Sequence, residues 1–308
     1  MKTQSRLEKV FAAGHIAVTS ECGPPRGANA DTVREKAAFL KEHVDACNVT
    51  DNQTAMVRMS SFAAAAIIKQ MGIEPVLQMV TRDRNRIAMQ SDVLGAYAHG
   101  IDTMLCLSGD HPKFGDHPMA NSVYDLDSVQ LIQTVKQMRD EEKFQGGAEI
   151  KGGAPKMFIG AAANPFADPF ELRVMRLAKK VAAGVDFIQT QCIFNLDKFE
   201  TWMEGVCARG LDEHVHIMAG ITPMKSAGMA RYMKNKVPGM DVPDEVIKRL
   251  DGVKKEDQAQ EGINMAIEAI QRLKEVKGVH GFHIMAIEWE EKVPEIVEKA
   301  GLFPRPEV

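Results

Sequence analysis

The strongest constraint on the fold of this chain is a unit that occurs eight times. In each unit, a short β-branched and apolar run leads into a polar or Gly/Pro break, and then into an amphipathic stretch with apolar residues at three- and four-residue spacing. The strand-like runs lie at 15–21, 46–52, 75–81, 103–110, 157–164, 187–194, 216–223 and 281–287. Strands that alternate with helices in this way favour parallel pairing through right-handed crossovers.

The amphipathic stretches predict helices at 32–43, 56–70, 86–99, 126–142, 168–183 and 197–208. Segment 225–276 is expected to hold more than one helix, because Pro238 and Pro243 interrupt it. A last helix is expected from Glu290 to Ala300.

Two closures of such a sheet are possible: an open doubly wound sheet and a closed barrel. The chain has no GxGxxG after its early strands and no GxxxxGK[ST], which are the phosphate-binding fingerprints of open nucleotide-binding sheets. Its 308 residues carry no linker or shift in composition, and a barrel of eight units needs ~250 residues. The sequence therefore predicts an α/β fold, a (β/α)8 TIM barrel forming a single domain over residues 1–308.

Charge and cysteine usage exclude several classes of partner. The formal net charge is -4 and no basic run stands outside a helix, so neither nucleic acid nor an anionic membrane is the expected partner. Lysines and arginines are interpreted as solvated helix faces. The five cysteines form no CxxC pair, which predicts neither disulfides nor a metal site. Without a signal-like segment or a run of ~18 apolar residues, a cytoplasmic protein with no membrane span is expected.

Nearly every predicted strand ends in a polar residue. These residues are Glu21, Thr50, Gln78, Asp110, Asn164, Gln191, Thr222 and Glu288. In a barrel, such ends open on one face, where the βα loops form the active site. Asp, Asn and Thr also favour helix caps and turns, but Gln does not, and Gln78 and Gln191 are embedded in apolar runs. We therefore expect a binding site at the carboxyl ends of the strands.

Three stretches carry the chemistry. In TSECGPPRG, Glu21 is held rigidly beside Gly and two prolines and suits a general acid; a rim ion pair with Arg26 is the alternative. In LSGDHP, Asp110 follows Gly109, and a turn or helix-cap role is the alternative. In TQCIFN, Gln191 offers a donor and an acceptor to a heterocycle such as a pterin or flavin. Lys180, upstream, is either a ligand contact or a solvated helix residue.

Together these stretches resemble the methylenetetrahydrofolate reductase family, over the whole chain and in order. The shared elements are ExxPPR (Glu21, Pro24, Pro25, Arg26), V-T (Val49, Thr50), GD-x-P (Gly109, Asp110, Pro112), K-V-x-A-G-x-D-x-x-x-T-Q (Lys180 to Gln191, with Val185 replacing an alanine) and G-I-x-P (Gly220, Ile221, Pro223). Each motif is weak alone, whereas their ordered set at strand ends is specific.

The resemblance implies a flavoprotein of one-carbon metabolism and methionine biosynthesis, which reduces 5,10-methylenetetrahydrofolate to 5-methyltetrahydrofolate. It implies that Glu21 is the general acid that protonates N10, and that Asp110 lies beside the flavin and the pterin. It assigns Gln191 to folate binding, and Thr50 and Lys180 to flavin binding. Gln78, Ser108, Gly109 and Asn164 fall on cofactor-binding positions, and Met285 falls on a substrate-binding one.

Several of these positions depart from the family pattern. Ser108 stands where Arg is common, Gln78 and Asn164 where His is common, and Met285 and Glu288 where Tyr and Asn are common. Because the usual side chains hold the phosphates, ribityl or adenosine of the flavin, FMN is an alternative to FAD. NADH is a candidate co-substrate, and some similar relatives receive electrons through a partner subunit. A homo- or hetero-oligomer is expected.

Two other functions are compatible with the sequence. One is a pterin-dependent methyltransferase barrel, and the other is an electron-accepting or docking subunit of a larger reductase complex. The colour of the purified protein separates them from a flavoenzyme, since only the flavoenzyme must be yellow and bleach on reduction.

Overall fold

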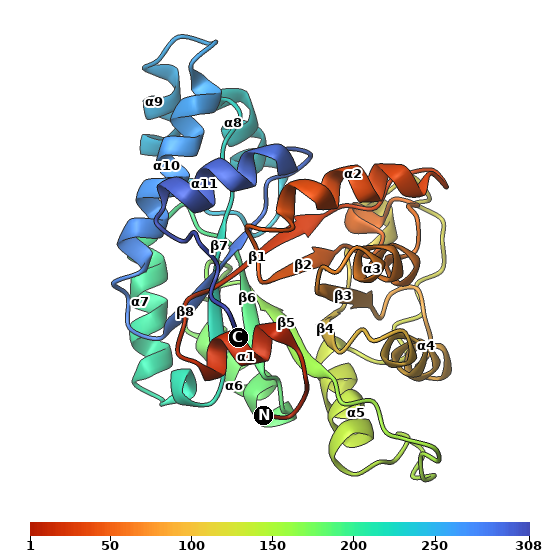
Figure 1. The fold of residues 1–308 in the computed structure, drawn as a ribbon. Coiled ribbons are helices and arrows are strands. Elements are labelled where there is room, and N and C mark those ends of the chain that lie inside the picture. Colours follow the sequence, from red (N-terminus) through yellow and green to blue (C-terminus); the bar gives the residue numbers. More distant parts are fainter.

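The eight strands form one closed parallel barrel, in chain order, in a computed structural model that describes residues 1–308 (Figure 1). The strands are β1 (Ala17–Cys22), β2 (Ala46–Val49), β3 (Pro75–Val80), β4 (Thr103–Leu107), β5 (Phe158–Ala163), β6 (Phe187–Cys192), β7 (His216–Ile221) and β8 (Val279–Ile284). Each strand pairs with the next, and β8 pairs with β1 to close the ring. The predicted (β/α)8 barrel is confirmed.

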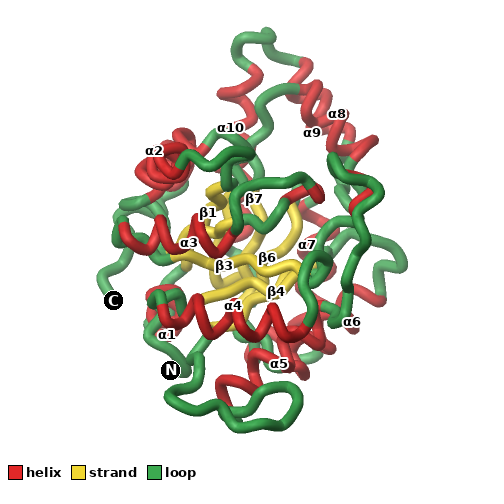
Figure 2. The backbone as a smooth tube through the Cα atoms, turned by 90° about the vertical axis from the view of Figure 1, so that its right-hand side faces the viewer, coloured by secondary structure: helices red, strands yellow, loops and turns green.

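Helices surround the strands, which lie at the centre of the molecule (Figure 2). The helices are α1 (Arg6–Ala12), α2 (Ala30–Leu40), α3 (Ser61–Gln70), α4 (Arg86–Ala98), α5 (Ser128–Asp140), α6 (Leu172–Ala183), α7 (Leu196–Cys207), α8 (Ala227–Lys236), α9 (Asp244–Asp251), α10 (Gln258–Leu273) and α11 (Val293–Lys299). Their apolar faces and the outward-facing strand residues form the main hydrophobic core between ring and barrel.

Two helices begin later than the sequence predicted. α3 begins at Ser61 rather than at 56, because the segment before it is drawn to the barrel rim, where the Met59 amide donates to Pro25 O (2.8 Å). α6 begins at Leu172 rather than at 168. Pro169 has no backbone N–H to donate and is followed by a turn, and the helix begins after that turn.

Helix α1, which is not among the helices predicted from the sequence, closes the amino end of the barrel. Leu7, Val10 and Phe11 are buried against the innermost strand residues in an apolar cluster separate from the main core. Gly160 on β5 leaves room for the Phe187 ring in this cluster, since a Cβ there would lie 2.3 Å from the ring. The barrel interior is therefore filled at this end.

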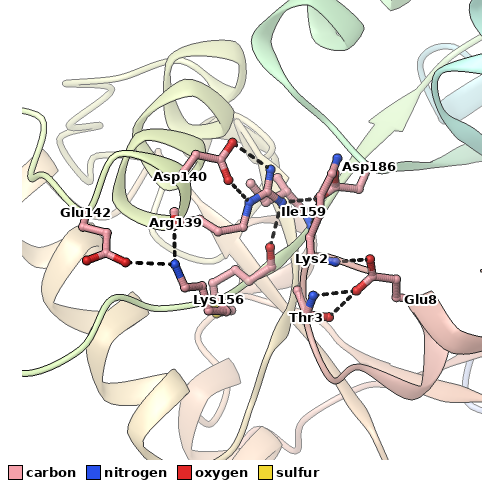
Figure 3. Close-up of polar contacts among 10 residues, drawn as sticks. Lys2, Thr3, Glu8, Arg139, Asp140, Glu142, Lys156, Ile159 and Asp186 are labelled. Atoms are coloured by element: carbon pink, nitrogen blue, oxygen red, sulfur yellow. Dashed lines mark hydrogen bonds and ion pairs between the residues drawn. The ribbon is translucent and has the colours of Figure 1, made fainter.

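A buried ion pair between Arg139 and Asp186 stabilises the amino end of the barrel (Figure 3). The Asp186 carboxylate accepts from the Arg139 guanidinium (2.6 Å) and from the Ile159 amide (2.8 Å), and it pairs with Lys2. The Arg139 and Asp186 side chains are each only 2% exposed. One carboxylate thus joins the N-terminal segment, α5, β5 and the start of β6.

Three helices, α8, α9 and α10, follow β7 where a simple barrel has one. α8 ends before Pro238 and α9 begins after Pro243, as predicted. Together with Met285 and Cys192, the inward faces of α8 and α9 form a small core of their own, to which Met224 and Met233 contribute. In Figure 1 these helices extend beyond the barrel.

Two carboxyl groups, Glu74 and Asp102, lie together just before β3 and β4, and they should make the stability of the fold depend on pH. Burial, and next the charge of Glu74, raise the pKa of Asp102 to about 8. A raised folded-state pKa contributes stability that is complete below the unfolded pKa of 3.8 and is lost as the pH rises through about 8.

We therefore expect Asp102→Asn to raise the melting temperature at about pH 9 relative to wild type, and to change it little at about pH 4. The amide cannot ionise, so it carries no cost at high pH. Melting curves of both proteins from about pH 4 to about pH 9 give the difference between their melting temperatures. The effects of all other titrating groups are the same in both proteins and cancel in this difference. Parallel curves at every pH would show that Asp102 does not hold its proton in the folded state.

Candidate active site

A cavity of about 450 Å³ opens at the carboxyl ends of the strands, within the range typical of small-molecule sites. It is lined by all ten residues to which the sequence assigned a catalytic, cofactor or substrate role: Glu21, Thr50, Gln78, Ser108, Gly109, Asp110, Asn164, Lys180, Gln191 and Met285. Thr222 and Glu288, which also end predicted strands, do not line it. Successive residues of a strand alternate between its two faces, so residues two apart, such as Gln189 and Gln191, both face the cavity.

Glu21, at the end of β1, faces His283 on the adjacent β8. The distance from Glu21 Oε1 to His283 Nε2 is 3.7 Å, and the Glu21 side chain is 17% exposed. The alternative pairing of Glu21 with Arg26 is wrong, because Arg26 turns away and pairs with Asp116 on an exposed loop. Glu21 therefore has no cationic partner of fixed charge, and its carboxyl group lines the cavity.

Thr50 and Asp110 line the cavity from the loops after β2 and β4. The Thr50 side chain is buried, and its Oγ1 has no hydrogen-bond partner. The Asp110 Oδ2 accepts from the Thr54 amide (3.1 Å) rather than capping a helix of its own. Gly109 has a positive φ of 84°, which explains a glycine before Asp110. These two loops thus place the unpaired Thr50 hydroxyl and the Asp110 carboxylate in the wall of the cavity.

Lys180 reaches from α6 into the cavity and donates to Ala162 O. Burial, and next the charge of Arg176, lower the pKa of its amine to about 8. The interpretation of Lys180 as a solvated helix residue is therefore wrong. Arg173 and Arg176 on the same helix also line the cavity, and the sequence analysis missed both because they resemble an ordinary polar helix face.

Two arginines of the β3–α4 loop were also misread as solvated. The Arg82 side chain is 3% exposed, pairs with Asp83 and donates to Asp110 O (2.9 Å). Arg84 pairs with the buried Asp51 at 2.7 Å. Arg82 is buried and Arg84 is partly buried, and their ion pairs and hydrogen bonds hold the loops after β2, β3 and β4 against one another. The alternation in TRDRN was the only sequence signal for them.

Gln78 and Gln191 have side-chain amides that bond no other protein group, so both are available to a ligand in the cavity. Asn164 differs, since its Nδ2 donates to Gly239 O (3.1 Å) and its Oδ1 accepts from the Phe166 amide (2.8 Å). Met285 packs against Cys192, with 3.8 Å between the two sulfurs. Asn164 and Met285 therefore shape the wall of the cavity.

The protein has no disulfide and no cluster of metal-ligating side chains. No group of three or more His, Cys, Asp or Glu side chains is arranged to hold a metal ion. All five cysteines are free, and four of them are buried. None of the helices combines the length and apolar character that a bilayer span requires.

Similarity to known proteins agrees with the geometry. Residues 6–301 match the family model for methylenetetrahydrofolate reductase. The chain is 26% identical over 265 residues to methylenetetrahydrofolate reductase 2 of Schizosaccharomyces pombe, covering 83% of this chain and 40% of that protein. It thus spans about two fifths of the length of such fungal relatives. It is 22% identical over 298 residues to 5,10-methylenetetrahydrofolate reductase of Pectobacterium carotovorum, covering 94% and 92%.

A solved structure shares the fold. A Clostridium thermocellum protein, described as uncharacterized and as binding two copies of 5-methyl-5,6,7,8-tetrahydrofolic acid, superposes with a TM-score of 0.69 at 13% identity, over 96% of this chain and 100% of that one. At this identity the likeness concerns the barrel alone. The family model, in contrast, covers nearly all of the sequence, and the chain therefore belongs to the methylenetetrahydrofolate reductase family.

Proposed function

We propose that this protein reduces 5,10-methylenetetrahydrofolate to 5-methyltetrahydrofolate with a bound flavin. The observation that carries the proposal is the single cavity at the barrel mouth, in which a carboxyl without a fixed-charge partner (Glu21), a second carboxylate (Asp110) and an unpaired amide (Gln191) meet. Membership of the family supports the same reaction.

The residues of the cavity fit a flavin. The unpaired Thr50 hydroxyl and the Gln78 amide suit the polar edge of an isoalloxazine ring. Lys180 and Arg176 supply positive charge for a phosphate, and a phosphate beside Lys180 would favour its charged form. When bound, the flavin would supply the hydride that the reaction needs. Reduced nicotinamide or a partner electron-transfer subunit is the proposed source of its electrons.

Three side chains then carry out the work of the protein itself. Glu21 gives its proton to N10 of the folate, which opens the five-membered ring and creates the electrophilic carbon. Gln191 holds the pterin through its amide, which can both donate and accept. Asp110 orients the pterin against the flavin. Buried walls, such as that formed by Met285, keep water from the reacting carbon.

The deciding experiment is the isolation of the cofactor. Protein purified without added flavin should be yellow, should bleach on reduction and should release stoichiometric flavin in acid. FAD is the expected species, and FMN alone would indicate that the small side chains at Ser108 and Asn164 shorten the site. A colourless protein that binds neither flavin would refute the proposal and favour a pterin-dependent methyltransferase.

Gln191→Ala should weaken folate binding while flavin content stays near that of wild type. Losing one hydrogen-bonding group in a partly buried site costs about 1–3 kcal/mol, which corresponds to a roughly 5- to 150-fold higher Kd. Titration of the oxidised protein with 5-methyltetrahydrofolate measures this. Equal affinities would remove Gln191 from the folate site.

A further inference from the structure

At the floor of the cavity, the barrel interior contains a layer of four polar side chains that the function described so far does not use, and two of them, Gln189 and His283, line the cavity. They are Thr19 on β1, Asn48 on β2, Gln189 on β6 and His283 on β8, with exposures of 0%, 0%, 3% and 3%. Below them lies the apolar cluster that fills the amino end of the barrel. Buried polar groups must satisfy one another, so the direction of one hydrogen bond in this layer fixes the directions of the others.

Asn48 and Gln189 form a reciprocal pair of amides. Asn48 Nδ2 donates to Gln189 Oε1 (2.7 Å), and Gln189 Nε2 donates to Asn48 Oδ1 (3.0 Å). The second hydrogen of Gln189 Nε2 points to Thr19 Oγ1, at 3.0 Å. Thr19 is thus an acceptor from Gln189, and its own hydroxyl proton must go elsewhere.

The only other group within reach of that hydroxyl is His283 Nδ1, at 2.9 Å. Thr19 therefore donates its proton to Nδ1, which must carry a lone pair. A neutral imidazole holds a single proton, so the proton of His283 lies on Nε2. That nitrogen is the one that faces Glu21 Oε1, at 3.7 Å.

We infer that His283 is a positioning residue for Glu21, held by the Asn48–Gln189–Thr19 chain in the tautomer that presents Nε2–H to the carboxylate. The inference rests on the proposed role of Glu21 as the general acid. Once Glu21 has given its proton to the folate, a carboxylate remains in a half-buried site, and a fixed N–H donor stabilises it and sets its direction. Such contacts are commonly long in a free enzyme and shorten in the complex with substrate.

The tautomer can be measured without any mutation. In protein labelled with ¹⁵N-histidine, His283 should show a pyrrole-like Nε2 and a pyridine-like Nδ1, with the signal assigned by its loss in His283→Gln. Thr19→Val should abolish this preference while the fold is kept. The opposite tautomer in wild type would mean that both amides are turned over, and it would overturn the inference.

Kinetics test the role. Thr19→Val and His283→Asn should each slow the folate half-reaction about 10- to 100-fold, because a misdirected catalytic group costs rates of this order. Reduction of the flavin by its donor should not change. Thr19→Ser restores the hydroxyl, and His283→Gln restores an N–H near the Nε2 position, so both should recover most of the rate.

Thr103→Val is the matched control. It removes an equally buried hydroxyl, bonded to Ser5 Oγ (2.7 Å), at the opposite end of the barrel, and should leave the folate half-reaction unchanged. If Glu21→Gln is slow but Thr19→Val and His283→Asn are not, the inference fails and the proposed function stands. If Glu21→Gln itself keeps the wild-type rate, the proposed role of Glu21 fails.

Discussion

Glu21→Gln is expected to slow folate reduction by about 10²- to 10⁴-fold, the usual contribution of a general acid. Gln has nearly the same shape as Glu but carries no transferable proton, so flavin content, stability and folate affinity should stay close to wild type. Reduction of the flavin by its donor needs no proton from Glu21 and should be unaffected. Stopped-flow measurement of the two half-reactions separates these effects.

Glu288→Gln provides the control for this substitution. Glu288 is exposed, lies just beyond β8 and does not line the cavity, so its loss should leave both half-reactions unchanged. If Glu21→Gln lowered both half-reactions together, Glu21 would be a structural residue and the proton would come from another group.

Asp186→Ala is expected to lower the free energy of unfolding by about 3–5 kcal/mol, the usual cost of removing one partner from a buried ion pair. The change leaves the Arg139 guanidinium in the interior without its buried partner, and it leaves the Ile159 amide without an acceptor. Chemical denaturation measures this effect. The cavity lies at the other end of the barrel, so flavin and folate binding should persist in the folded fraction.

Asp140→Ala tests whether the large loss of stability expected for Asp186→Ala comes from the burial of the Asp186 carboxylate. Asp140 bonds the same guanidinium, with Arg139 Nε to Oδ1 at 2.7 Å, but its side chain is 42% exposed. Ion pairs at the surface contribute roughly 0–1 kcal/mol, and Arg139 keeps its pair with Asp186 in this variant, so the loss of stability should be smaller than in Asp186→Ala. Similar losses for both variants would contradict the assignment of the cost to burial.

The barrel and most of its mouth could be predicted from local pattern. Strand alternation sets which side chains face inward, and the polar residues that end the strands therefore converge once the sheet closes. Gln78 and Gln191 were found in this way, since glutamine does not suit a helix cap, and Glu21 was found in the rigid TSECGPPRG stretch at the end of the first strand. The resemblance to a known family then implied chemical roles for these positions, which pattern alone left open.

Contacts between side chains that lie far apart in the sequence could not be predicted. Arg82 and Lys180 have the spacing of solvated residues, and only the tertiary structure buries them against the loops and β5. His283 had no recognisable spacing, because its partners come from strands that meet only in the closed barrel. Helix α1 was missed because its apolar residues gain a partner only after that closure.

The separate core beneath α8 and α9 has a consequence for motion. Because these helices pack mainly on that small cluster rather than on the main core, they can open as a local unit at a lower free energy than global unfolding. Their amides should then exchange with deuterium before those of the barrel strands. The Asn164–Gly239 bond joins this unit to the cavity wall, so each opening would loosen the rim of the site, and a bound ligand would slow the exchange.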